Sequence, residues 1–346
     1  MHAASALNLR PLRTLSVDAG THPRGQAWLS AASGLVCAQG RVYVVADDEH
    51  HLAVFRDAVT PGTLHRLTAG DLPTPPAERK RLKPDLETLI WLPADTLPDD
   101  TLRAGSAGAL VALGSGSTAL RERAFVVPVG ADGEPLVAAT QSIALSPLFA
   151  PLRARWGEIN IEGAFCVGDE FVLLQRGGDG LRGGNAVVRY AQGDVLPLWR
   201  GQRGGEIAPR ALHPCALGAL EGVGLGFTDG AAWPDAGEQS ATGGAARGFL
   251  FTAVAEDSTD HVADGACRGS VIGHLSLDGR LHWMRRLHSK RRLHGRPKVE
   301  GLALRVTAAG TRLCLVTDDD DPASASMLLQ AGLGGWDAAT PRARRT

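Results

Sequence analysis

One short segment recurs along this chain of 346 residues, and its repetition limits the folds that are possible. In each copy a polar residue directly precedes an apolar run, as in the letters DLETLIWL, NIEGAFCV and VEGLALRV. That residue is Glu87, Glu162, Glu300 and, less clearly, Glu221, and it is Ser33 in the first copy. The copies are roughly 55 to 80 residues apart, at the long end of the periods of repeats that each form one supersecondary unit.

Each copy predicts a hairpin followed by further strands. A turn bearing Gly, Asp or Thr leads to a second apolar strand, as in EGAFCVGDEFVLLQRGG, and this strand ends in a polar loop. A third strand follows, and we interpret TLHRLTA, VLPLWR and RLHWMRRL as fourth, more polar strands. Four antiparallel strands per repeat predict an all-β fold, a single β-propeller with five blades or, if a long repeat hides one more, six. The letters LSPLFAPLRARW predict a short helix.

The propeller is expected to be one domain over residues 1–335, followed by a tail at 336–346. Its blades are expected to begin near residues 33, 87, 162, 221 and 300. A strand at residues 8–17 should pair as the outermost strand of the last blade, which closes the ring and covers a sheet edge. In the fourth repeat either Glu221 or Gly224 is expected to face the central tunnel.

The charge balance argues against a nucleic-acid or membrane-surface binder. The chain has 36 Lys and Arg against 37 Asp and Glu, so its net charge is close to zero. No apolar run is long enough to span a membrane, and the first residues lack the apolar stretch of a signal peptide. We therefore expect a cytoplasmic monomer whose five cysteines are reduced thiols.

The topology of a propeller predicts that several carboxylates meet at one mouth of the tunnel. The first strand of each blade lines the tunnel, and it starts at the face where the second strand ends. Ser33, Glu87, Glu162 and Glu300 should therefore surround the axis. Converging carboxylates need raised pKa values or a cation, and oxygen ligands without His or Cys favour Ca²⁺. The alternative is that each glutamate holds a neighbouring blade through backbone N–H groups or a buried arginine.

The same mouth is expected to collect residues that could bind and process a ligand. Two basic runs, at 79–83 and 285–298, directly precede Glu87 and Glu300 and suit an anionic substrate, although they could also be solvated loops. The candidates for substrate binding are Lys83, Gln175, Arg176, Arg296 and Lys298. The candidates for catalysis are Asp47, Asp48, His50 and Asp318.

The recurring segments with which the repeats begin, here called the opening segments, resemble those of the phytase-like (esterase-like activity of phytase) β-propeller family. The five repeats are also similar to calcium-activated nucleotidase (apyrase) propellers. The resemblance implies that Glu87, Glu162 and Glu300 are metal ligands in the tunnel and that Ser33 contributes an oxygen. It also implies a Ca²⁺-dependent hydrolase of a small anionic molecule such as a phosphate ester. The alternative is a non-catalytic propeller that binds a ligand or a protein around a structural ion, because fold does not determine function.

Overall fold

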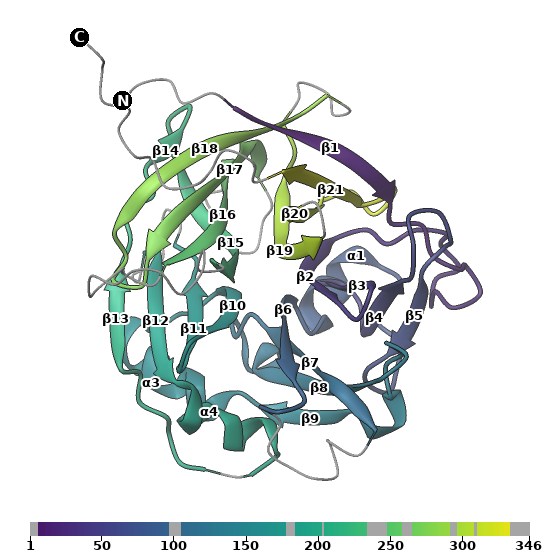
Figure 1. The fold of residues 1–346 in the computed structure, drawn as a ribbon, viewed down its shortest axis with the longest axis horizontal. Helices are drawn as coiled ribbons and strands as arrows, with labels where there is room; N and C mark the ends of the chain where they lie inside the picture. The colour runs from purple at the N-terminus through teal and green to yellow at the C-terminus, as the bar shows by residue number, and fades with distance from the viewer. Residues whose placement is uncertain are drawn as a thin grey trace.

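In the computed structural model the chain forms a ring of β-sheets around a central axis (Figure 1). The structure describes residues 6–96, 105–177, 184–202, 204–233, 248–257, 265–290, 296–307 and 310–332. The predicted tail at 336–346 lies outside these residues. Within them, no helix has the length and apolar character needed to cross a membrane.

Three blades are separate four-stranded antiparallel sheets, each built from strands that follow one another in the sequence. The first consists of β2 (Ala32–Ala38), β3 (Arg41–Ala46), β4 (His51–Phe55) and β5 (Thr63–Arg66). The second consists of β6 (Leu86–Pro93), β7 (Ser106–Gly114), β8 (Arg123–Gly130) and β9 (Gln141–Ala144). The third consists of β10 (Ile161–Val167), β11 (Glu170–Gln175), β12 (Ala186–Ala191) and β13 (Ala211–Pro214).

The remaining strands form one nine-stranded sheet that contains two more four-stranded units. The fourth blade consists of β15 (Val223–Ala232), β16 (Gly248–Asp257), β17 (Ala266–Ser276) and β18 (Leu281–Ser289). The short β14 (Ala219–Leu220) pairs with the beginning of β15. The fifth blade consists of β19 (Val299–Thr307), β20 (Gly310–Thr317), β21 (Met327–Gly332) and β1 (Leu7–Thr14).

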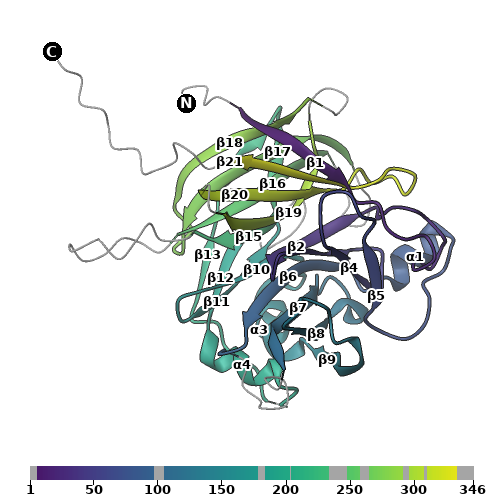
Figure 2. The same ribbon diagram turned by 45° about the vertical axis from the view of Figure 1, so that its right-hand side comes forward.

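The N-terminal strand closes the ring, as predicted. β1 pairs antiparallel with β21, with Arg10 opposite Gln330, so it is the outermost strand of the last blade. Its beginning also pairs in parallel with β18, with Leu7 opposite Leu287. Both views show β1 between β18 and β21 (Figures 1 and 2). The strand therefore covers the outer edges of two blades at once.

The core lies between the blades. The inner strands β2, β6, β10, β15 and β19 contact one another in this order, and β19 contacts β2, so the described strands form a closed ring of five blades. An apolar cluster lies at each of the five junctions; Val45 and Leu110, for example, belong to the cluster between the first two blades. Because both faces of a blade are covered, a strand in its middle such as β4 is buried throughout instead of alternating between buried and exposed residues, whereas an outermost strand such as β5 is only partly buried.

Helices occupy some of the connections between strands. α1 (Pro76–Leu82) precedes β6 and carries most of the first basic run. α3 (Ser146–Trp156) is the predicted helix, and the short η1 (Ala119–Arg121) and η2 (Val137–Ala139) flank β8. The prediction of a fourth strand from VLPLWR was wrong, because these letters belong to α4 (Gln192–Trp199). Val195, Leu198 and Trp199 are buried there, and their spacing suits one face of a helix.

Candidate functional site

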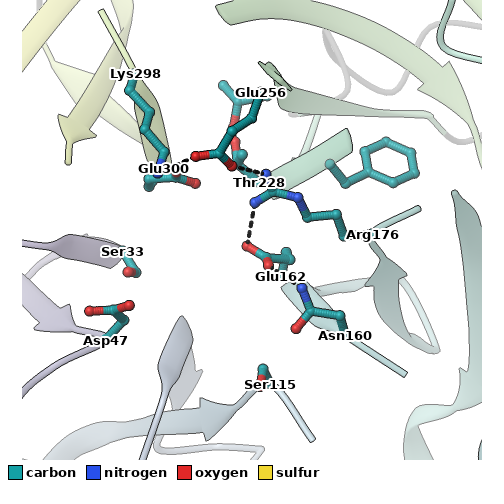
Figure 3. A network of polar contacts seen from close by, with 12 residues as sticks. Ser33, Asp47, Ser115, Asn160, Glu162, Arg176, Thr228, Glu256, Lys298 and Glu300 are labelled. Atoms are coloured by element: carbon teal, nitrogen blue, oxygen red, sulfur yellow. Dashed lines mark hydrogen bonds and ion pairs between the residues drawn. The ribbon is translucent and has the colours of Figure 1, made fainter. Parts of the chain in front are cut away.

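A β-bulge at the same point of every inner strand selects the residue that faces the axis. The pairing of each inner strand with its neighbour shifts once, and a bulge leaves its extra residue outside the ladder. The shifts occur at Ala32/Leu35, Leu86/Thr88, Ile161/Gly163, Phe227/Asp229 and Val299/Gly301. They place Ser33, Glu87, Glu162, Thr228 and Glu300 at equivalent positions. Figure 3 shows Ser33, Glu162 and Glu300 around one opening.

The fourth blade departs from the predicted frame. Thr228, and neither Glu221 nor Gly224, holds the bulged position, and its Oγ1 donates a hydrogen bond to the Val299 carbonyl at 2.9 Å. Glu221 lies before β15, where its Oε1 is 2.8 Å from Arg296 Nη2. The letters LEGVGLGF imitate an opening segment, whereas the true one is FTDG, in which threonine replaces the expected glutamate.

A second ring of side chains comes from the residue that follows the second strand. In four blades the backbone N–H of this residue donates to the carbonyl two positions before the bulged residue, which fixes both segments at the mouth. The four bonds run from Asp47 to Ala31 (3.1 Å), Ser115 to Asp85 (2.9 Å), Arg176 to Asn160 (2.8 Å) and Asp318 to Lys298 (3.2 Å). The predicted convergence of Asp47, Arg176 and Asp318 follows from this repeated bond.

These rings enclose a cavity of about 1110 Å³. The acidic side chains that line it are Asp47, Asp85, Glu87, Glu158, Glu162, Glu256, Glu300, Asp318 and Asp320. The basic ones are Lys80, Arg81, Lys83, Arg121, Arg176 and Lys298. Nine carboxylates against six bases leave an excess of acid, so the cavity either retains protons or favours a cation.

Three of the carboxylates form a group that could hold a metal ion. Ligand oxygens of Asp47, Asp85 and Glu87 lie within 4.8 Å of one another. No other His, Cys, Asp or Glu group of this kind occurs in the part of the chain that the structure describes. Of the predicted metal ligands, only Glu87 belongs to this group. Glu162 and Glu300 extend from other blades of the ring and are not members of this group.

Lys83 supplies a positive charge to this acidic group. Its ammonium donates to Asp47 Oδ2 and lies 2.9 Å from Asp85 Oδ1. The other oxygen of Asp85 accepts from Arg121 Nη1 at 2.9 Å. With the described residues, the Glu87 carboxylate makes neither a hydrogen bond nor an ion pair. The group is therefore partly neutralised by the chain itself, and Glu87 is the carboxylate left to interact with a ligand.

Lys298 plays the corresponding part at the fifth blade, where Figure 3 shows it beside Glu256 and Glu300. Its ammonium lies 3.1 Å from Glu256 Oε1 and 3.4 Å from Glu300 Oε1, and it donates to Asp320. Glu256 is on β16 of the fourth blade, whereas the other three residues belong to the fifth. One buried ammonium thus joins the carboxylates of two blades.

Arg176 joins the third blade to the fourth. Its Nη2 donates to Glu256 Oε2 at 2.8 Å, and its Nη1 lies 3.5 Å from Glu162 Oε2. Asn160 Nδ2 donates to the other oxygen of Glu162 at 2.6 Å. The predicted alternative, in which an axial glutamate holds a neighbouring blade through a buried arginine, describes Glu162 well.

Burial raises the pKa values of several carboxyls in the cavity toward neutral pH. It raises the pKa of Glu300 to about 8, although nearby Lys298 and Arg176 oppose the shift. It also raises the pKa of Asp318 to about 7. Burial and the charge of Glu162 raise the pKa of Glu87 well above its usual range. These carboxyls can therefore exchange protons at a pH where ordinary surface carboxylates are ionised.

Four of the predicted site residues are not among those that line the cavity. Gln175 is buried, accepts from the Asn160 N–H at 2.9 Å, and holds that loop in place. Arg296 is engaged at the surface by Glu221 as described above. Asp48 lies 3.5 Å from a guanidinium nitrogen of Arg24, and the His50 ring is 3.3 Å from the Gly70 carbonyl.

Sequence reasoning missed several residues of the cavity. Asp85, Asn160 and Glu256 were not singled out, although each binds a residue that was. Asp85 and Asn160 lie two positions before the bulged glutamates, so the repeated frame could have identified them. Glu256 had no such signal, because the sequence does not show how far β16 extends past the bulge of its neighbour β15.

The raised pKa values predict that the protein loses stability as the pH rises from 6.5 to 8.5. In this range Glu300 and Asp318 are partly protonated in the folded state and ionised in the unfolded chain, so folding binds protons that alkali removes. We expect the free energy of unfolding to fall by on the order of 2 kcal/mol. Urea unfolding at several pH values measures this. Glu300→Gln should flatten the profile, whereas Asp169→Asn, at an exposed turn, should leave it unchanged.

The family model for DUF6929, a family of unknown function, matches residues 28–333. The chain belongs to this family. No curated protein matches it. The matched residues include all five inner strands and every residue of the cavity described above.

Solved structures give distant likenesses. Glutaminyl cyclase from Myxococcus xanthus is 10% identical at a TM-score of 0.44, with 94% of this chain and 98% of that chain covered. Regucalcin from Agrobacterium tumefaciens, described as a calcium-binding protein, is 9% identical at 0.43, with 95% of each chain covered. The Bacillus subtilis arabinanase Arb43A is 11% identical at 0.39, with 88% and 95% covered. At these values the fold assignment depends on the strand pairing of this chain itself.

Proposed function

We propose that this member of DUF6929 is a hydrolase of a small anionic molecule, such as a phosphate ester, and that it uses Ca²⁺ in the axial cavity. The observation that carries the proposal is the group formed by Asp47, Asp85 and Glu87 at the wall of a cavity of about 1110 Å³. Carboxylate oxygens are the ligands that Ca²⁺ prefers, and the cavity is large enough for a small molecule. The phytase-like and apyrase-like resemblance of the opening segments supports the same proposal.

The rim of the cavity offers a contact for the anionic substrate. The bases deeper in the cavity, Lys83, Arg176 and Lys298, are bonded to carboxylates and are not available to an anion. Arg81, at the end of α1, lines the opening and is exposed, and it makes no ion pair with a described residue. A guanidinium in this position can attract and orient a phosphate or carboxylate. We therefore assign the first contact with substrate to Arg81.

Two buried carboxyls can provide the proton transfers that hydrolysis needs. When bound, Ca²⁺ would polarise a phosphoryl or carbonyl oxygen of the substrate. Glu300 and Asp318, whose pKa values are about 8 and about 7, can donate or accept a proton near neutral pH. Both line the cavity, so either can reach a bound molecule. The buried Lys298 ammonium, which contacts Glu300, holds that carboxyl in place.

A second candidate function is a non-catalytic binding module. The observation that favours it is Lys83, whose ammonium already neutralises Asp47 and Asp85. If this lysine stays in place, the acidic group is structurally complete and needs no ion. Ca²⁺ binding requires the Lys83 side chain to move away from these two carboxylates.

Added Ca²⁺ is expected to stabilise the protein. A ligand present at a hundredfold excess over its Kd stabilises the folded state by about 2.7 kcal/mol. Melting curves in excess Ca²⁺ and in EDTA measure the difference. Glu87→Gln should abolish it, because this change removes the carboxylate that has no internal partner. Asp169→Asn, at an exposed turn between β10 and β11, should retain it, and equal melting temperatures of the wild type in both conditions would favour the binding module.

Hydrolysis is tested with a panel of nucleotides, phosphomonoesters and short acyl esters in the presence of Ca²⁺. Activity on a member of the panel should fall by about 10²- to 10⁴-fold in Glu300→Gln, the range expected for loss of a general acid or base. Arg81→Gln should instead raise KM, because it changes the rim and not the protonatable carboxyls. Stabilisation by Ca²⁺ without turnover of any compound would leave a metal-binding module and exclude hydrolysis of these substrate classes.

A further inference from the structure

Two cysteines that are far apart in the sequence meet where the last blade joins the first. Cys37 lies in β2 and Cys314 in β20, and these two strands are in contact. Both side chains belong to the apolar cluster at this junction, in which Cys314 is buried and Cys37 is half-buried. This end of β2 is opposite to the bulge at Ser33, so the pair is separate from the axial cavity, whose lining includes neither cysteine.

The approach of the neighbouring strands explains why the two thiols meet. A Cβ placed on Gly301 would be 3.2 Å from the Leu35 Cβ, so β19 runs closely along β2. Two residues further along each strand, on the same faces, are Ala303 and Cys37. Cys314 is the cross-strand partner of Ala303. The Cys314 side chain is thereby brought close to Cys37 within the same apolar cluster, where each thiol shifts the pKa of the other.

We propose that Cys37 and Cys314 form a reversible disulfide when the protein meets a hydroperoxide, and that this bond joins the first blade to the last. The Cys314 thiolate attacks one oxygen of hydrogen peroxide and becomes a sulfenic acid, while the other oxygen leaves and takes a proton to form water. The Cys37 thiol then attacks the sulfenic sulfur, and a second water leaves. Two thiols and one peroxide give one disulfide and two waters.

The surroundings of the pair favour this reaction over oxidation elsewhere. Interaction with the Cys37 thiol lowers the pKa of Cys314, and the nearby Arg305 acts in the same direction, against the effect of burial. Burial raises the pKa of Cys166 to about 12 and that of Cys267 to about 11, so these thiols yield less thiolate. In the reduced protein the ring is closed by β1 and by apolar packing. The disulfide adds a covalent closure at the same junction.

Mass spectrometry of the full-length protein tests the proposal. After treatment with hydrogen peroxide, alkylation of remaining thiols and digestion without reductant, we expect a linked peptide pair that contains Cys37 and Cys314 and that dithiothreitol separates. The melting temperature of the oxidised protein should rise by about 5 °C, because the bond closes a loop that spans most of the chain. Both effects should disappear in Cys314→Ser and persist in Cys166→Ser, which changes the matching position of the third blade.

Cys37→Ser provides a second test that alters a half-buried side chain, in case Cys314→Ser does not fold. It should also lose the linked pair, and its single remaining thiol at this junction should proceed to sulfinic acid. The proposal is overturned if peroxide converts Cys37 or Cys314 of the wild type to sulfinic acid without forming the linked pair. It is equally overturned if Cys314 becomes linked to other cysteines as often as to Cys37.

Discussion

Replacement of Arg176 by methionine is expected to lower the free energy of unfolding by about 4 kcal/mol. The guanidinium is shared by Glu162 and Glu256, which belong to different blades, and both carboxylates are largely buried. Methionine fills a similar volume but leaves these carboxylates without their cation. Removing one partner of a buried ion pair is strongly destabilising because the remaining charge has lost its solvation. Urea unfolding followed by tryptophan fluorescence measures the change.

A matched control separates this effect from the general loss of a surface charge. Arg210 lies 3.1 Å from Asp169, but the two side chains are 45% and 70% exposed. Arg210→Met should therefore change the free energy of unfolding by less than about 1 kcal/mol. Adding Glu256→Gln to Arg176→Met should recover part of the lost stability, since it removes one of the unpaired charges. A loss in Arg176→Met no larger than in the control would mean that the network at the mouth does not hold the blades together.

Gly301→Ala is expected to destabilise the protein by about 3 kcal/mol, because the junction between the last and first blades has no room for a side chain there. A Cβ at this position would be 2.1 Å from the Ser33 carbonyl oxygen and 2.6 Å from Val316 Cγ2. The first of these atoms belongs to the backbone of the neighbouring inner strand. Relief of the clash therefore requires one blade to shift against the other, which also moves Glu300 and Ser33 at the axis.

Gly224 provides the control for this substitution. It lies in an inner strand as Gly301 does, but a Cβ there would meet no atom within 4 Å. Gly224→Ala should leave stability within about 1 kcal/mol of the wild type, because alanine restricts the unfolded chain without a clash in the folded one. Thermal melting of the two variants side by side gives the comparison. Equal melting temperatures would show that the blades are not packed as closely as the inner strands indicate.

The resemblance between repeats was enough to predict the fold, but the residue at the axis required the strand pairing. Glu87, Glu162 and Glu300 were found because each begins an apolar run in a common frame. Thr228 was missed because its identity differs and because Glu221 imitates the pattern seven residues earlier. A bulge is a property of two paired strands, and one strand read alone does not show where it falls.

The sequence alone determined most of the strand order, the closure by the N-terminal strand and the face on which the polar residues gather, although it misassigned the fourth strand of the third blade. These features depend on local apolar runs, on turns and on the order of segments along the chain, all of which can be read directly from the amino-acid sequence. Only the tertiary structure decided that Lys83 lies between Asp47 and Asp85, that Arg176 joins two blades, and that Glu87 forms an acidic group with Asp47 and Asp85. The reason is physical. Which charges are neighbours around a ring depends on distances of a few ångströms between blades, and electrostatic interaction and metal coordination change sharply over such distances.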